Sequence, residues 1–108
     1  MNGFQDRQAS FEKKYALDEE ARFKALVKRN RKLGLWAAQG LNLEGEDVKS
    51  YVEGVVNYAL KGGHDEDLLA KIYADFQTAG HILDEKVLKA NMVSFLQEAL
   101  GAEEKGSA

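Results

Sequence analysis

The chain contains no cysteine and no proline. The absence of cysteine excludes disulfides, thiol nucleophiles and cysteine-ligated zinc, so the core must be held together by packing alone. The 10 glycines mostly stand where periodic segments stop, and together with the absence of proline this favours helices joined by short turns. A length of 108 residues is typical of one domain, which buries roughly two thirds of the surface that the unfolded chain exposes.

Long hydrophobic runs are also missing. No apolar stretch approaches the length of a membrane span, and a composition of 44% hydrophobic and 31% charged residues is typical of a soluble globular chain. Residues 1–15 lack the apolar centre of a secretory signal and contain acids that a mitochondrial transit peptide avoids. We therefore expect a cytoplasmic protein that does not insert directly into a membrane.

No catalytic or metal-binding motif is recognisable. Residues 40–47 have the glycine spacing of a phosphate loop, but Glu46 and Asp47 stand where a lysine and a hydroxyl residue are needed. The acidic run after His64 is better explained by helix capping than by metal binding, because adjacent helical residues do not face one another. His81 stands in a turn without a paired nucleophile. We expect no enzyme, no metal site and no cofactor.

Helical periodicity dominates the sequence. Apolar residues recur every three or four positions over residues 22–39, 46–60, 66–79 and 85–100, which predicts helices. The β-branched stretch around Gly54 is also compatible with a short strand, although no partner strand is evident. Burying each apolar face against another predicts an all-α fold, a small antiparallel helical bundle. The predicted faces, in chain order, are Phe23, Leu26, Val27, Leu33 and Ala37; Val48, Val52, Val55 and Ala59; Leu69, Ile72, Phe76 and Ala79; and Leu88, Met92, Phe95 and Ala99.

A few residues predict where the last two helices begin and end. Asp65 and Asp84 are candidate N-caps, because their side chains can accept hydrogen bonds from the first free backbone amides. Gly80 and Gly101 stand where glycine commonly ends a helix. Residues 102–108 then form a flexible tail.

The first predicted helix carries a dense basic face. Lys24, Lys28, Arg31 and Lys32 lie opposite its apolar face, with Arg22 and Arg29 at the border. A net charge of -3 and a pI of about 5.4 disfavour a nucleic-acid partner. Binding to a membrane surface is disfavoured because the bundle needs the apolar face. The basic face is therefore either solvated or in contact with a protein.

Residues 4–19 do not fit the bundle. Phe4, Phe11 and Tyr15 line up in a narrow arc that Gln8 interrupts, and this stripe is too thin for a core. The segment is either a marginally stable first helix, which frays or packs loosely, or a disordered segment that folds when a partner supplies apolar surface. Physical reasoning alone leaves both alternatives open.

Three quoted stretches together resemble a known family: "FQDRQASFEKKYALDEEARFKALVKRNRKLGLWAAQGL", "GHDEDLLAKIYADF" and "AGHILDEKVLKANMVSFL". They are similar to the zeta-subunit family, the ATPase inhibitor of α-proteobacterial F1Fo-ATP synthase. The similarity extends from residue 4 to about residue 100. Its most specific positions are Phe4, Asp6, Arg7, Phe11, Glu12, Lys14, Asp18, Glu19, Glu20, Phe23, Lys24, Ala25, Arg29, Asn30 and residues 33–38.

The resemblance implies a four-helix bundle whose N-terminal segment, residues 1–19, inserts between subunits of the F1 catalytic head. Inhibition of ATP hydrolysis would follow from blocked rotation, with the alpha, beta and gamma subunits as partners. Residues 20–101 would form the bundle domain, and the protein would be peripheral to the inner membrane through F1. The implied partner-binding residues are the anchors Phe4, Phe11 and Tyr15, the bases Arg7, Lys13 and Lys14, and the acids Asp6, Glu12, Asp18 and Glu19.

The resemblance also suggests structural roles within residues 22–39. Phe23 would lie on the core face, Gly34 would permit a close helix approach, and Asn30 would need a buried hydrogen-bond partner. Trp36 lies about 100° or more from the centre of the apolar stripe, so it must meet a different helix, a turn or the partner surface, and core packing is the favoured role.

Two other functions remain open at this stage. One is a protein adaptor without any effect on an ATPase. The other is a regulatory module that binds nucleotide weakly on the basic face of residues 22–32, through Lys24, Lys28 and Arg31.

Overall fold

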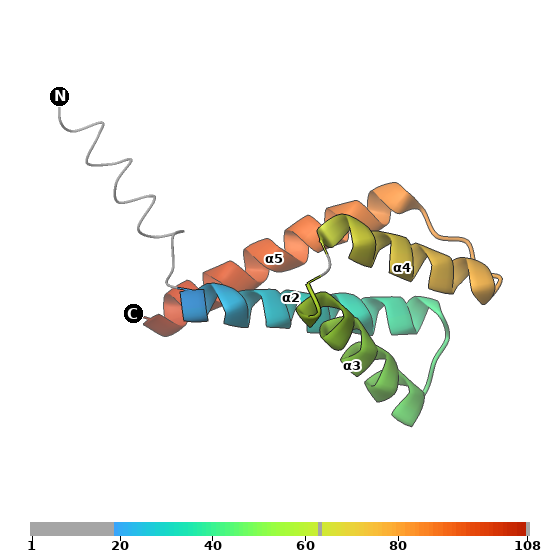
Figure 1. The fold of residues 1–108 in the computed structure, drawn as a ribbon, viewed down its shortest axis with the longest axis horizontal. Coiled ribbons are helices and arrows are strands. Elements are labelled where there is room, and N and C mark those ends of the chain that lie inside the picture. The colour runs from blue at the N-terminus through green and yellow to red at the C-terminus, as the bar shows by residue number, and fades with distance from the viewer. Residues whose placement is uncertain (1–18, 63, 108) are drawn as a thin grey trace.

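The computed structural model describes residues 19–62 and 64–107, which contain four helices and no strand (Figure 1). The all-α prediction is therefore confirmed, and the stretch around Gly54 is helical. The helices are α2 (Glu19–Gly40), α3 (Glu46–Leu60), α4 (Asp65–Thr78) and α5 (Glu85–Ser107).

Helix α2 is the central element of the bundle. It makes its most extensive contacts with α3 and α5. Figure 1 shows α5 running back along α2, so that the last turns of α5 lie beside the first turns of α2. Helix α3 begins away from α2 and its last turns overlap the middle of α2 in this view, while α4 lies over the carboxyl-terminal part of α2. The beginning of α2 is thus covered by fewer helices than its end.

The core lies where all four helices meet. Its buried apolar side chains come from every helix, and Trp36 packs against them from the side. The Trp36 and Phe76 rings are 6.3 Å apart at an interplanar angle of 31°, within the range of favourable tilted aromatic pairs. The core residues are Leu33, Ala37, Leu41, Val55, Leu68, Ile72, Phe76, Leu88 and Met92.

Two glycines of α2 allow neighbouring helices to approach closely. A Cβ atom at Gly34 would lie 3.1 Å from the Cα of Val52, so α3 crosses where α2 has no side chain. A Cβ atom at Gly40 would lie 2.7 Å from the ring of Phe76. These two positions fix how tightly α3 and α4 pack on α2.

The observed ends of α4 and α5 differ partly from the predicted ones. Asp65 is the first residue of α4 rather than its N-cap, and Asp67 accepts a hydrogen bond from the His64 amide at 3.1 Å. Asp84 caps α5 as predicted, because its Oδ1 accepts a hydrogen bond from the Lys86 amide at 2.8 Å. The predicted stop at Gly101 is wrong, since α5 continues to Ser107.

The buried face of α4 includes the predicted Ile72 and Phe76, but it contains Leu68 in place of the predicted Leu69 and Ala79. Leu68, Ile72 and Phe76 are buried, whereas Leu69 is half-buried and Ala79 is exposed. The observed spacing of four residues keeps one row of side chains against the other helices. Both registers look equally apolar in the sequence, and only the packing of the neighbouring helices selects one.

Candidate partner-binding site

Most of the proposed partner-binding residues lie outside the described residues. These are Phe4, Asp6, Arg7, Phe11, Glu12, Lys13, Lys14, Tyr15 and Asp18. Glu19 is the first residue of α2 and is exposed. The structure does describe the part of the chain that follows these residues, namely the first turns of α2.

These first turns are sparsely covered. Between residues 19 and 28 only Ala25 is buried, and Leu26 and Val27 are half-buried. Phe23 was expected on the core face, but 52% of its surface is exposed. The reason is that α3 crosses α2 at Gly34 and α4 begins beside Arg29, so neither helix reaches Phe23.

The basic face of α2 is largely compensated within the chain. The ammonium group of Lys28 pairs with the Glu103 carboxylate of α5, and Lys32 pairs with Glu98 of the same helix. Within α2, Lys24 Nζ lies 3.2 Å from Glu20 Oε1, one helical turn earlier. Exposed pairs of this kind stabilise a fold only slightly, but they cancel much of the local positive field.

Arg31 differs from these lysines in its surroundings. It lines a shallow groove between α2 and α3, together with Leu35 and Lys49. The three residues considered for nucleotide binding, Lys24, Lys28 and Arg31, therefore do not form one uncompensated anion site, because two of them already face carboxylates.

A buried arginine was missed by the sequence analysis. Arg29 is only 3% exposed, and its guanidinium reaches Asp65 in the first turn of α4 at 2.7 Å and 3.3 Å. Its Nε donates to Asn30 Oδ1 at 2.8 Å, which gives the buried Asn30 side chain a partner. The bidentate contact between Arg29 and Asp65 holds the beginning of α4 against the middle of α2. The available signal was the position of Arg29 beside the apolar face, where a cation needs a partner.

A second polar cluster joins α3 to α4. The Tyr51 hydroxyl donates to Asp75 Oδ2 at 2.9 Å, and Lys71 Nζ donates to the same oxygen at 2.8 Å. Lys71 also lies over the rings of Tyr51 and Tyr58, at 5.3 Å and 5.8 Å from their centroids. Burial, and then the hydrogen bond to the negatively charged Asp75, raise the pKa of Tyr51 well above its ordinary value.

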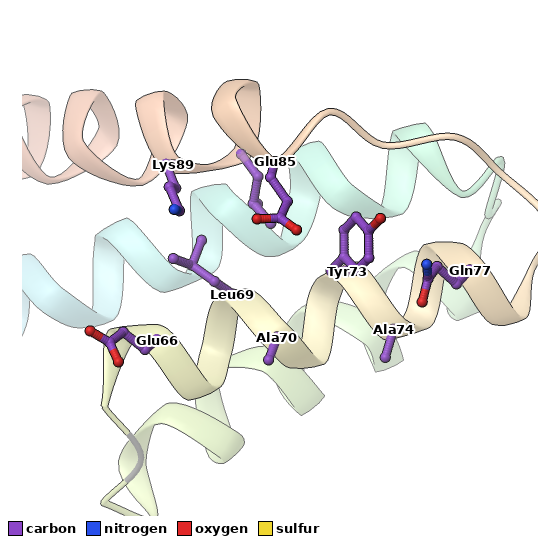
Figure 2. A pocket seen from close by; sticks show the side chains of 9 residues that line it. Glu66, Leu69, Ala70, Tyr73, Ala74, Gln77, Glu85 and Lys89 are labelled. Atoms are coloured by element: carbon purple, nitrogen blue, oxygen red, sulfur yellow. The ribbon is translucent and has the colours of Figure 1, made fainter.

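A groove separates α4 from α5 on the surface of the bundle. Figure 2 shows Leu69 and Tyr73 projecting from α4 toward Lys89 and Glu85 of α5. The space holds about 440 Å³ and is open to solvent along one side. Its lining residues are Glu66, Leu69, Ala70, Tyr73, Ala74, Gln77, Glu85, Leu88 and Lys89.

The described part of the chain contains neither a metal-binding cluster nor a membrane-spanning helix. Within residues 19–62 and 64–107, no group of three histidine, aspartate or glutamate side chains is placed to hold a metal ion. None of the helices in these ranges is long and apolar enough to cross a membrane.

Comparison with known proteins bears directly on the N-terminal segment. The family model for ATPase inhibitor subunit zeta matches residues 1–102, which include both the segment and nearly all of the bundle. A comparison with individual curated proteins finds no match. The resemblance seen in the sequence is thus confirmed, and a family of inhibitor subunits is regulatory rather than catalytic. The chain belongs to the ATPase inhibitor subunit zeta family.

Proposed function

We propose that this protein inhibits ATP hydrolysis by F1Fo-ATP synthase by inserting its N-terminal segment between subunits of the F1 catalytic head. The observation that carries the proposal is the family match, which begins at residue 1 and so includes the segment as well as the bundle. The partners are then the alpha, beta and gamma subunits, and the protein is held at the inner membrane only through F1.

The sequence and structure suggest a division of labour within the chain. Phe4, Phe11 and Tyr15 are the anchors that fill an apolar groove between subunits, where buried aromatic residues contribute most of the binding energy. Arg7, Lys13 and Lys14 pair with acidic groups along that groove. A helix wedged between subunits that must move relative to one another blocks rotation and therefore hydrolysis.

In this proposal the bundle holds the N-terminal segment at one end. Helix α2 begins at Glu19, the last residue of the segment, and its middle is held against α4 through Arg29 and Asp65. A bundle at the outer end of the segment limits how far the chain can enter the groove. The bundle itself supplies no inhibitory group in this proposal.

The first test is ATP hydrolysis by the cognate F1 particle, with the full chain and with a chain that lacks residues 1–18. We expect only the full chain to inhibit. Binding of both chains to F1 is measured in parallel by co-sedimentation. Binding of the full chain without inhibition would instead identify a protein adaptor, and equal inhibition by both chains would exclude the insertion mechanism.

The anchors are tested by replacing Phe4, Phe11 and Tyr15 with alanine together. We expect inhibition to be abolished while the thermal unfolding of the bundle is nearly unchanged. The matched control replaces Gln5, Gln8 and Ser10 with alanine in the same segment and should inhibit nearly as well as the parent chain. Retained inhibition in the anchor variant would show that other residues hold the segment.

A further inference from the structure

The first turns of α2, residues 19–28, are helical although they bury little. Ala25 is their only buried residue, and 52% of the Phe23 surface is exposed. Most helical stability in proteins comes from tertiary packing, and a helix end that lacks packing opens and closes locally while the rest of the protein stays folded. Contacts that contribute little to the stability of the whole fold can therefore decide whether these turns stay helical.

The neighbour of these turns is the carboxyl end of α5 (Figure 1). Two ion pairs join the helices there, Lys28 with Glu103 and Lys32 with Glu98. A step of four positions forward along α2 corresponds to a step of five positions back along α5, which is the register of two antiparallel helices. Extended by one turn, this register places Lys24 beside the last turn of α5. The two pairs thus lie where the end of α5 reaches the amino half of α2.

Charged groups make up much of the described contact. Ala25 has a single methyl group, whose burial contributes little apolar stabilisation. The Glu103 side chain is only 13% exposed, so its attraction to Lys28 is screened less than an attraction between two fully exposed groups. Lys32 also lies over the Phe95 ring, 5.3 Å from its centroid, which adds a cation–π contact between the same two helices. Both lysines of α2 are therefore held to α5 by their charge.

We propose that these two interhelical ion pairs form a salt-sensitive contact that controls the helicity of the first turns of α2. With the pairs formed, the end of α5 covers residues 19–28 and holds them in helical form. When salt screens the pairs, the end of α5 separates from α2 and these turns fray. The core stays folded in both states, because the first core residue of α2 is Leu33.

The consequence for inhibition rests on the proposed function, whereas the contact itself does not. The proposed inhibitory segment leads into these turns, so a helical base presents the segment to its partner from a fixed position. A frayed base has to be ordered when the segment binds, and the conformational entropy that is lost weakens binding. The end of α5 thus adjusts the affinity of a segment that lies far from it in the sequence.

Hydrogen exchange of backbone amides, measured by NMR on the full chain, tests the contact directly. Glu98→Gln with Glu103→Gln removes the negative charge from both pairs. We expect exchange at Val27 and its neighbours in α2 to become about threefold to tenfold faster. Exchange at the core residue Ile72 should change by less than about twofold, because the core does not open with the helix end. Unchanged exchange at Val27 would overturn the proposal.

The matched control is Glu44→Gln with Glu53→Gln, which changes the net charge equally at two exposed positions outside α2 and α5. It should leave exchange at Val27 within about twofold of the parent value. Equal acceleration in the control would show that net charge, and not the two ion pairs, governs the first turns of α2, and it would overturn the proposal.

Exchanging the charges of one pair separates pairing from damage to the helix. Glu103→Lys alone places two cations side by side and should accelerate exchange at Val27, and Lys28→Glu alone should do the same. The double variant Lys28→Glu with Glu103→Lys again has opposite charges and should slow the exchange toward the parent value. A double variant that exchanges as fast as Glu103→Lys alone would overturn the proposal.

Salt provides a measurement on the unmodified chain. Raising the NaCl concentration from about 0.01 M to about 1 M shortens the Debye length from about 30 Å to about 3 Å. In the parent chain, we expect exchange at Val27 relative to Ile72 to accelerate by about threefold over this range. The variant with both glutamines should not respond. A parent chain without this response would overturn the salt sensitivity.

Inhibition of ATP hydrolysis by F1 tests the consequence. The variant with both glutamines should need an about threefold higher concentration for half-maximal inhibition, with the same maximal inhibition, because its N-terminal segment is unchanged. An unchanged half-inhibitory concentration together with faster exchange would refute the consequence for inhibition. If the parent chain does not inhibit, the proposed function fails, whereas the exchange measurements still decide whether the contact controls α2.

Discussion

The two halves of α2 are packed very differently. Its carboxyl half, residues 29–40, contains six of the seven buried residues of the helix and meets α3, α4 and α5. Its amino half, residues 19–28, contains only one buried residue and is accompanied mainly by the end of α5. The proposed inhibitory segment is attached to the sparsely packed half.

This difference indicates that the carboxyl half of α2 contributes mainly to stability, whereas the amino half carries the proposed functional segment. Substitutions in the carboxyl half remove buried contacts that hold four helices together, whereas the amino half can change with little cost to the fold. A binding segment mounted on the amino half is thus free to vary without unfolding the bundle. Three pairs of substitutions and one single substitution test how far the stability depends on such buried contacts.

The largest contrast is expected between two phenylalanines. Phe76→Ala removes a ring that is 3% exposed and packs on Trp36, so it should lower the free energy of unfolding by about 3–5 kcal/mol. Phe23→Ala removes a ring that is 52% exposed and should cost less than about 1 kcal/mol. Urea unfolding followed by circular dichroism measures both. Equal losses would show that the amino half is as important for stability as the core.

The next contrast concerns two neighbouring acids in the first turn of α4. Asp65→Ala leaves the buried Arg29 guanidinium without its carboxylate and should cost about 2 kcal/mol, less than a fully buried pair because Asp65 is largely exposed. Glu66→Ala removes the same favourable charge from the helix start, but no described partner, and should cost about 0.5 kcal/mol. Equal urea midpoints for the two variants would mean that water replaces Asp65 at Arg29.

Two glycines provide a contrast of opposite sign. Gly34→Ala forces a Cβ atom to 3.1 Å from the α3 backbone and should destabilise the protein by about 1–3 kcal/mol. Gly101→Ala adds a methyl group inside α5, where nothing lies within 4 Å, and should stabilise by up to about 1 kcal/mol through helix propensity. Thermal unfolding of the two variants gives both signs. A stabilising Gly34→Ala would show that α3 can move away without loss.

At neutral pH, Tyr51→Phe removes one hydrogen bond to Asp75 and should cost about 1 kcal/mol. Because the pKa of Tyr51 is raised in the folded state, the unfolded chain releases the phenol proton first, at about pH 10. The stabilisation is therefore complete below about pH 10 and is lost as the pH rises toward the folded pKa. Lysines titrate in the same range, so the informative quantity is the difference between parent and variant in urea unfolding. A difference that stays constant above that pH would exclude the raised pKa.

The sequence predicted the helices well because their signals are local. The apolar spacing of α3 and α5, and the capping aspartate of α5, lie within one or two turns of each other. The end of α5 was not predicted because Gly101 is a common stop signal, whereas the helix continues to pair with Lys28 from a segment 75 positions away. The contact between α5 and α2 thus outweighs the local signal of Gly101 for helix termination.

Burial within α2 could not be predicted for the same reason. By hydrophobicity, Phe23 should be buried and Arg29 exposed. The structure shows the reverse, with the aromatic ring of Phe23 exposed and the guanidinium of Arg29 buried. Their surroundings are set by where α3 and α4 begin and end, and by the presence of Asp65 at the start of α4. Of the candidate site, the anchors came from residue spacing and family resemblance, and they remain predictions. The described structure adds the exposed Glu19 at their base and the groove between α4 and α5.

The pairing of α2 with the end of α5 has a consequence for synthesis on the ribosome. Chains emerge from the amino end, and contacts between neighbouring helices form before contacts between distant ones. The partner of Lys28 is Glu103, so the amino half of α2 is not covered until α5 has been translated. Of the four described helices, α2 is thus the first to be made while its amino half is the last to be covered, and we expect a chaperone that engages the nascent chain to encounter this half before α3, α4 or α5 is complete.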